Sequence, residues 1–157
     1  MANKSILLID DNENDILLAQ RALKMSNISN HVVVARSGEE ALDYLFCRSN
    51  YASRDVNCSP PVVALLDLNM PRLHGLEVLK QIRENSKTKH LPVVILTSSN
   101  EESDLIQSYD LGCNAYLRKQ VDFNQFAEAV KQLGLFWLVL NEPPISPDPA
   151  SGNFIGG

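Results

Sequence analysis

The chain has 157 residues, of which 45% are hydrophobic and 21% charged, and its formal net charge is -5. This length and composition are typical of one globular domain with a sizeable core, without a second folded domain. The 14 basic residues are scattered, which argues against a nucleic-acid surface, because phosphate binding needs clustered lysine and arginine.

Two further features bear on where the protein works. The N-terminal apolar run extends only from Ile6 to Ile9, far short of a signal peptide or a membrane span. Cys47, Cys58 and Cys113 are odd in number and lack metal-ligand spacing, which favours free or buried thiols over a disulfide framework. We therefore expect a cytoplasmic protein without a membrane segment.

The first part of the chain predicts two pairs of a strand and a helix. The continuous apolar run Ile6–Ile9 fits a strand buried on both faces, and helical spacing of apolar residues predicts a helix over Asn14–Met25. The β-branched run His31–Ala35 predicts a short second strand. The capping-box spacing of Ser37–Glu40 then opens a helix that extends through Phe46.

The middle of the chain contains the most informative strand. The polar segment from Cys47 to Pro60 lacks periodicity, so we expect a surface loop. The apolar run that starts at Pro61 predicts a buried strand with Asp67 at its carboxyl end. A helix with an inward apolar stripe follows and ends near Asn85.

The last part of the chain predicts two more strands and two helices. Pro92–Thr97 is an apolar strand, and the capping-box spacing of Ser99–Glu102 predicts a helix that stops at Gly112. Ala115–Leu117 predicts a short fifth strand. The last helix is expected from about Asp122 to Leu140.

Five strands that alternate strictly with five helices imply an α/β fold with a parallel, doubly wound sheet. Parallel neighbours need crossover helices, which is why the alternation decides the fold class. We expect one domain over residues 1–142 and a disordered tail over residues 143–157, where proline, serine and glycine are frequent.

Functional groups stand at the ends of four of the predicted strands: Asp10 and Asp11 follow the first, Asp67 follows the third, Thr97 ends the fourth and Lys119 follows the fifth. Parallel strands bring these groups to one edge, where three carboxylates repel one another unless a hard cation lies among them. Mg2+ suits this position, because it prefers oxygen ligands and keeps waters that phosphate oxygens can replace. A lysine and a hydroxyl beside it would suit a phosphoryl group.

At these residues the sequence resembles the receiver domains of two-component response regulators, over about residues 4 to 140. The resemblance rests on the acid pair, the Asp67 strand with Asn69-Met70-Pro71 and Gly75 after it, Thr97-Ser98 and Lys119. It implies the flavodoxin-like receiver topology. It also implies a signalling protein, not an enzyme, that accepts a phosphoryl group from a phosphohistidine of a sensor histidine kinase.

The resemblance gives the acids separate roles. Asp67 would be the phosphoacceptor and would also face the Mg2+ ion. Asp11 and the backbone carbonyl of Asn69 would bind Mg2+ directly, and Asp10 would act through water.

The resemblance also implies roles for groups on the last two strands. Thr97 and Lys119 would hold the phosphoryl oxygens, and Tyr116 would be the aromatic whose rotamer follows the phosphorylation state. From the residues alone, Thr97 could be a plain strand residue and Tyr116 a half-buried core aromatic. Receivers usually carry a proline, often after a cis bond, where this chain has Gln120, and here we expect either a trans bond or a strained cis exception.

More narrowly, the long loop before the third strand, the 121–126 segment and Phe136-Trp137 resemble the small regulators that pair with cyanobacterial phytochromes. This resemblance implies a phytochrome as the kinase and a homodimer. The apolar end of the last helix supports a dimer, because residues 135–140 are nearly all apolar and one amphipathic face suffices to dock a helix. The alternative is that the C-terminal segment folds back over these side chains.

Two other functions use a similar site or a similar fold. A haloacid dehalogenase-like phosphatase also uses an aspartate and Mg2+, but its Asp-x-Asp pattern is broken by Asp10-Asp11-Asn12. A flavodoxin-like nucleotide binder would need a phosphate loop in place of these acids. Glu13 and Asp15 are interpreted as helix N-terminal acids, and only His74 among the histidines is placed to reach the rim of the site.

Overall fold

The computed structural model describes residues 5–25, 28, 30–54, 59–119 and 123–135. Five parallel strands form one sheet in the order β2-β1-β3-β4-β5. Their bounds are β1 Ile6–Ile9, β2 Val32–Ala35, β3 Val63–Leu66, β4 Val93–Thr97 and β5 Ala115–Arg118. The predicted doubly wound α/β fold is confirmed.

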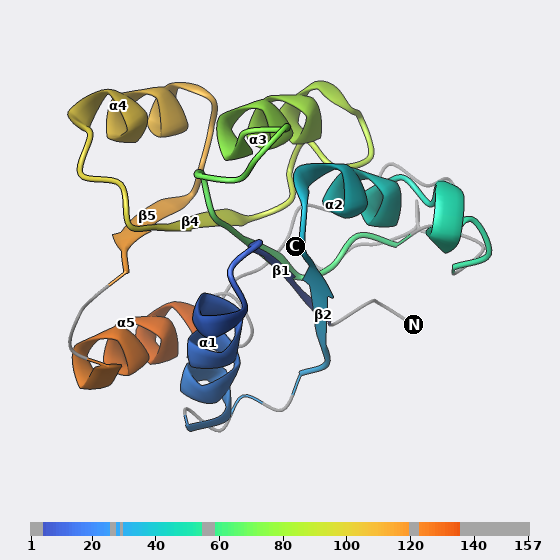
Figure 1. Ribbon diagram of the computed structural model, residues 1–157. Coiled ribbons are helices and arrows are strands. Elements are labelled where there is room, and N and C mark those ends of the chain that lie inside the picture. Colours follow the sequence, from blue (N-terminus) through green and yellow to red (C-terminus); the bar gives the residue numbers. More distant parts are fainter. Residues whose placement is uncertain (1–4, 26–27, 29, 55–58, 120–122, 136–157) are drawn as a thin grey trace, which may run out of the picture.

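Helices cover both faces of the sheet (Figure 1). Their bounds are α1 Glu13–Met25, α2 Gly38–Leu45, α3 Gly75–Glu84, α4 Glu102–Asp110 and α5 Phe123–Leu135. Helices α1 and α5 lie side by side on one face, and α2, α3 and α4 lie on the other (Figure 1). None of the helices in the described part of the chain is long and apolar enough to cross a membrane.

Two separate hydrophobic cores result from the alternation of side chains along each strand. In β1, Leu7 and Ile9 belong to the core beneath α2 and α3, while Ile6 and Leu8 belong to the core beneath α1 and α5. Every residue of β1 is therefore buried, which explains why its sequence is a continuous apolar run.

Local signals explain two of the helix boundaries. Ser37 is the N-cap of α2, and its side chain accepts a hydrogen bond from the Glu40 backbone N–H, as its spacing predicts. Helix α4 ends at Asp110, and Gly112 follows with a φ of 92°. That left-handed conformation is the usual helix stop and favours glycine.

The predicted start of α4 is wrong. Ser99 does not cap this helix, because Glu101 is the N-cap and the helix begins at Glu102. The Ser99 hydroxyl instead accepts a hydrogen bond from the Glu101 backbone N–H and donates one to Asp104. The tail over residues 143–157, the end of the last helix and the bond after Lys119 lie outside the described residues.

The loop before β3 is tied to α2 instead of standing free. It contains a short 3-10 helix, Ser49–Tyr51, whose Tyr51 hydroxyl donates a hydrogen bond to Glu40. The Arg54 guanidinium lies 4.0 Å from the centre of the Tyr44 ring and donates to the Tyr44 carbonyl. These contacts hold the described part of the loop against the end of α2.

The expectation of free thiols holds for one described cysteine and fails for another. Cys113 is buried and free, and burial raises the pKa of its thiol to about 11, so it stays protonated at neutral pH. Cys47, however, is disulfide-bonded. Spacing in the sequence does not reveal this bond, because a disulfide depends on the distance between two cysteines in the folded chain.

Candidate functional site

The site lies where the strand order reverses. The chain leaves β1 to form β2 on one side and returns to form β3 on the other, so β1 and β3 are neighbours. In open α/β sheets, ligands bind at the carboxyl ends of the strands at this switch point. Asp10 directly follows β1 and Asp67 directly follows β3, so the topology itself brings these two carboxylates together.

Three acids form a cluster at this edge. One carboxylate oxygen from each of Asp10, Asp11 and Asp67 lies within 4.8 Å of the other two. Asp10 and Asp67 are buried, whereas Asp11 is exposed. Burial raises the pKa of Asp10, although hydrogen bonds from Lys119 and the Asn12 backbone oppose the rise. Hard oxygen donors at this spacing, open to solvent at one side, fit a divalent cation such as Mg2+.

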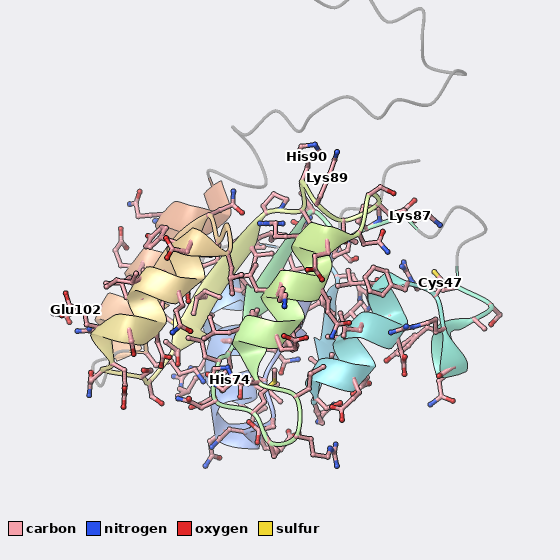
Figure 2. The ribbon with its side chains drawn as sticks, turned by 90° about the horizontal axis from the view of Figure 1, so that it is seen from above. Cys47, His74, Lys87, Lys89, His90 and Glu102 are labelled. Atoms are coloured by element: carbon pink, nitrogen blue, oxygen red, sulfur yellow. The ribbon has the colours of Figure 1, made fainter. Side chains whose placement is uncertain are left out.

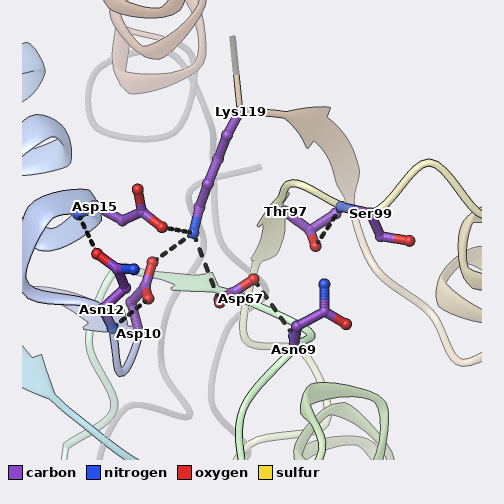
Figure 3. Close-up of polar contacts among 8 residues, drawn as sticks. All are labelled: Asp10, Asn12, Asp15, Asp67, Asn69, Thr97, Ser99 and Lys119. Carbon is purple, nitrogen blue, oxygen red and sulfur yellow. Dashed lines mark hydrogen bonds and ion pairs between the residues drawn. The ribbon is translucent and has the colours of Figure 1, made fainter. Parts of the chain in front are cut away.

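Lys119 reaches across the acids from the end of β5 (Figure 3). Its Nζ atom lies 2.7 Å from Oδ2 of Asp10, 2.8 Å from Oδ2 of Asp15 and 3.6 Å from Oδ2 of Asp67. Burial alone would lower the pKa of Lys119, but its hydrogen bonds to Asp10 and Asp15 outweigh burial, and the pKa is raised. The side chain is therefore a fixed positive charge within the acid cluster.

Thr97 and Tyr116 lie on the face of the sheet that α2, α3 and α4 cover. Thr97 is fully buried at the end of β4, and its hydroxyl accepts a hydrogen bond from the Ser99 backbone N–H at 3.2 Å (Figure 3). The Thr97 hydroxyl proton therefore remains available for another acceptor. Tyr116 packs against the core beneath α2 and α3, and burial raises the pKa of its hydroxyl. The nearby Ser99 side chain opposes this rise in pKa, although no hydrogen bond of normal geometry to the Tyr116 hydroxyl is found among the described residues.

The loop after β3 presses closely against Asp67. The Asn69 backbone N–H points toward Oδ1 of Asp67 at 3.5 Å, and the Gly75 backbone N–H donates to the Leu68 carbonyl. A Cβ atom at Gly75 would lie 2.6 Å from the Leu68 Cα and would collide with the Asp67 carbonyl oxygen. Only glycine fits here, so Gly75 is needed for the position of the Asp67 backbone.

The histidines do not join the site. His74 is the N-cap of α3, and its Nδ1 atom accepts a hydrogen bond from the Leu76 backbone N–H at 3.1 Å. His90 lies at the opposite end of the molecule from His74, beside Lys89 (Figure 2). His74 thus lies on the predicted side of the molecule, but its ring nitrogen is used to cap a helix.

The structure brings together Asp10, Asp11, Asp67 and Lys119 as the sequence predicts, and adds a residue that sequence reasoning missed. Asp15 lies in the first turn of α1, as predicted, and its carboxylate also binds Lys119. The two residues are separated by 104 positions, so no local spacing could reveal the pair. Only the folded structure shows that Lys119 has Asp15 as an acid partner in addition to Asp10 and Asp67.

Comparisons with known proteins agree with this geometry. The family model for the response regulator receiver domain matches residues 6–131. The response regulator Rcp1 of Synechocystis is 38% identical over 135 residues, which are 86% of this chain and 89% of Rcp1.

Solved structures give the same result. The phosphorylated cyanobacterial phytochrome response regulator RcpA superposes with a TM-score of 0.82 at 40% identity, covering 92% of this chain and 100% of RcpA. The Mn2+-bound form of Rcp1 superposes with a TM-score of 0.80 at 37% identity, covering 90% of this chain and 99% of that protein. A relative with the same fold has thus been seen with a divalent cation bound.

Proposed function

This chain belongs to the response regulator receiver domain family, and we propose that it accepts a phosphoryl group on Asp67 from a sensor histidine kinase of the phytochrome type. It is a signalling protein related to the phytochrome response regulators. The observation that carries the proposal is the arrangement of a buried Asp67 between two further acids and one lysine. The haloacid dehalogenase-like alternative finds no support in the family match.

Asp10, Asp11, Asp67 and the backbone carbonyl of Asn69 are the groups that we assign to a Mg2+ ion. The cluster of three carboxylates supports a divalent cation, since hard oxygen ligands are those that Mg2+ prefers. When bound, the cation would neutralise the acids and the charge on the incoming phosphoryl oxygens.

In the proposed transfer, a carboxylate oxygen of Asp67 attacks the phosphorus of a phosphohistidine. A new P–O bond forms as the P–N bond breaks, the electron pair leaves with the imidazole nitrogen, and an acyl phosphate remains on Asp67. The Lys119 ammonium would hold one phosphoryl oxygen as a point charge. The Thr97 hydroxyl, which already accepts from the Ser99 backbone, would donate its proton to another.

Output would pass through protein contacts. The Ser99–Asp104 hydrogen bond joins the loop after Thr97 to the first turn of α4. A change at the Thr97 hydroxyl therefore has a direct route to α4, and Tyr116 on the neighbouring strand would follow it. We further propose that the chain works in the cytoplasm as a homodimer formed through its last helix, without nucleic acid or membrane partners.

Incubation of the full chain with acetyl phosphate and Mg2+, followed by intact mass measurement, tests the proposal. The wild type should gain one phosphoryl group, and Asp67→Asn should gain none. Asp110→Asn, which changes an exposed acid at the far end of α4, is the matched control and should be labelled like the wild type. Equal labelling of Asp67→Asn and the wild type would show that Asp67 is not the acceptor.

A further inference from the structure

Asp15 is the acid at the site that the proposed function leaves without a role. Its Oδ2 atom lies 2.8 Å from the Lys119 Nζ atom, nearly as close as the Asp10 oxygen at 2.7 Å. Figure 3 shows the ammonium joined by dashed lines to both carboxylates and to Asp67, which lies farther away at 3.6 Å. Asp15 is 32% exposed, whereas Asp10 is only 4% exposed, so the two partners offer Lys119 different environments.

The start of α1 explains why the Asp15 carboxylate is available. Asp15 is the third residue of the helix, and in a capping box that side chain would reach back to the N-cap N–H. Here the Asn12 N–H donates to Oδ1 of Asp10 instead, while the Asn12 side chain accepts from the Asp15 N–H. Because Asp10 takes the N-cap donor, the Asp15 carboxylate is left to bind Lys119.

The contacts of Asp10 conflict with cation binding. Its Oδ1 accepts from the Asn12 backbone and its Oδ2 accepts from Lys119, so both oxygens are engaged. The same carboxylate belongs to the cluster that fits a divalent cation. A cation and an ammonium group repel each other, so a cation that approaches Asp10 must drive Lys119 away from it.

We propose that Asp15 is a positioning residue that receives the Lys119 ammonium when a divalent cation binds at Asp10, Asp11 and Asp67. The inference rests on the metal site of the proposed function. By keeping Lys119 paired as it leaves Asp10, Asp15 makes cation binding more favourable and holds the amine beside the site, where a phosphoryl group could reach it.

The space around the pair allows this movement. A small, partly open pocket of about 60 Å3 is lined by Asp10, Asp15 and Lys119 together with apolar side chains from β1, α1 and β4. Leu18 and Ala19, one turn along α1 from Asp15, form part of its wall. Lys119 already contacts Asp15 at this pocket, so it can leave Asp10 and keep an acid partner with only a small movement.

Removing Asp15 would affect cation binding in two ways: Lys119 would lose its second acid partner, and the site would lose a nearby negative charge. The loss of a negative charge lowers the affinity of any nearby cation site, whatever Lys119 does. A double-mutant cycle distinguishes the two effects, because only a role through Lys119 disappears when Lys119 has no charge.

The experiment is a calorimetric titration of the full chain with Mg2+, for the wild type, Asp15→Asn, Lys119→Gln and the double variant. We expect Asp15→Asn to weaken Mg2+ binding by about three- to tenfold in the wild type and by less than twofold in the Lys119→Gln chain, a coupling typical of residues in contact. Glu13→Gln is the matched control, since it removes a charge from the same helical turn but pairs with Arg36. It should change Mg2+ affinity less than twofold.

Each outcome decides one point. Equal weakening by Asp15→Asn in both backgrounds, or none in the wild type, overturns the role of Asp15 and leaves the proposed function standing. A wild-type chain that binds no Mg2+ overturns the metal site and this inference together. Circular dichroism of each variant establishes that a loss of affinity is not a loss of fold.

Discussion

At the scale of single residues, the three acids that would bind a cation also lower the stability of the metal-free fold. Asp10, Asp11 and Asp67 are held within 4.8 Å of one another, and like charges this close destabilise the protein that carries them. Lys119 forms ion pairs with Asp10 and Asp67 and offsets the repulsion there. Among the described residues, Lys119 forms no ion pair with Asp11. Asp11 is thus the acid whose charge is least compensated in the described structure.

Replacing Asp11 by alanine should therefore change stability in opposite directions with and without metal. The metal-free variant should be more stable than the wild type, because repulsion at the sheet edge is relieved. Saturating Mg2+ should stabilise the wild type more, since only the folded chain with all its ligands binds the ion tightly. Urea unfolding in each condition measures both differences, and a variant that gains as much from Mg2+ as the wild type would remove Asp11 from the metal site.

Gly75 offers a test of how the backbone positions Asp67. Gly75→Ala should destabilise the fold by about 1–3 kcal/mol and should slow phosphorylation, because its Cβ would displace the Asp67 carbonyl. Gly38→Ala is the matched control, since its Cβ would meet Val78 and Leu73 side chains away from the site. At a temperature where both variants are folded, only Gly75→Ala should be labelled slowly by acetyl phosphate. Similar rates for the two variants would contradict the positional role.

At the scale of elements, α3 depends on an unusual cap. His74 accepts from the Leu76 N–H through a ring nitrogen, where aspartate, asparagine or serine is more common. His74→Ala should lower the unfolding free energy by about 1 kcal/mol, and His74→Asn should restore it. His90→Ala, at the far end of the molecule, should have little effect (Figure 2). Urea unfolding of the three variants measures this, and equal stability of His74→Ala and His90→Ala would refute the cap.

The elements also show what sequence reasoning can reach. All five strands are predicted to within two residues, most clearly β1 and β3, because a strand buried on both faces is apolar throughout. Helix α4 began later than predicted, because Ser99 has the spacing of a cap but uses its hydroxyl for Glu101 and Asp104. Local spacing identifies candidate caps, and the path of the loop decides which one is used.

The candidate site also contains both contacts that the sequence predicts and contacts that it does not. Acids and a lysine at the ends of parallel strands can be predicted to meet, since the topology brings strand ends to one edge. The Lys119–Asp15 pair could not be predicted, because it depends on which acid of α1 faces β5. The disulfide at Cys47 was missed for a related reason, since the loop before β3 folds against α2 through contacts that no local pattern announces.

At the scale of the whole molecule, the apolar C-terminal part of the chain bears on how it associates. The apolar residues 135–140 of the predicted last helix motivate a homodimer, and most of them lie beyond the described residues. Sedimentation equilibrium of the wild type and Phe136→Asp at matched concentration tests it. We expect the wild type to be dimeric at micromolar concentration and the variant to be monomeric. A monomeric wild type would support the alternative, in which the C-terminal segment covers these side chains within one chain.

The central claim is that Asp67 carries the phosphoryl group, and chemical trapping tests it most directly. Borohydride reduces an acyl phosphate to an alcohol, which would convert a phosphorylated Asp67 to homoserine and leave ordinary carboxylates unchanged. The chain would be incubated with acetyl phosphate and Mg2+, reduced, digested and sequenced by mass spectrometry. We expect homoserine at position 67 and nowhere else. Homoserine at Asp10 or Asp11, or phosphorylated protein whose Asp67 remains unreduced, would contradict it.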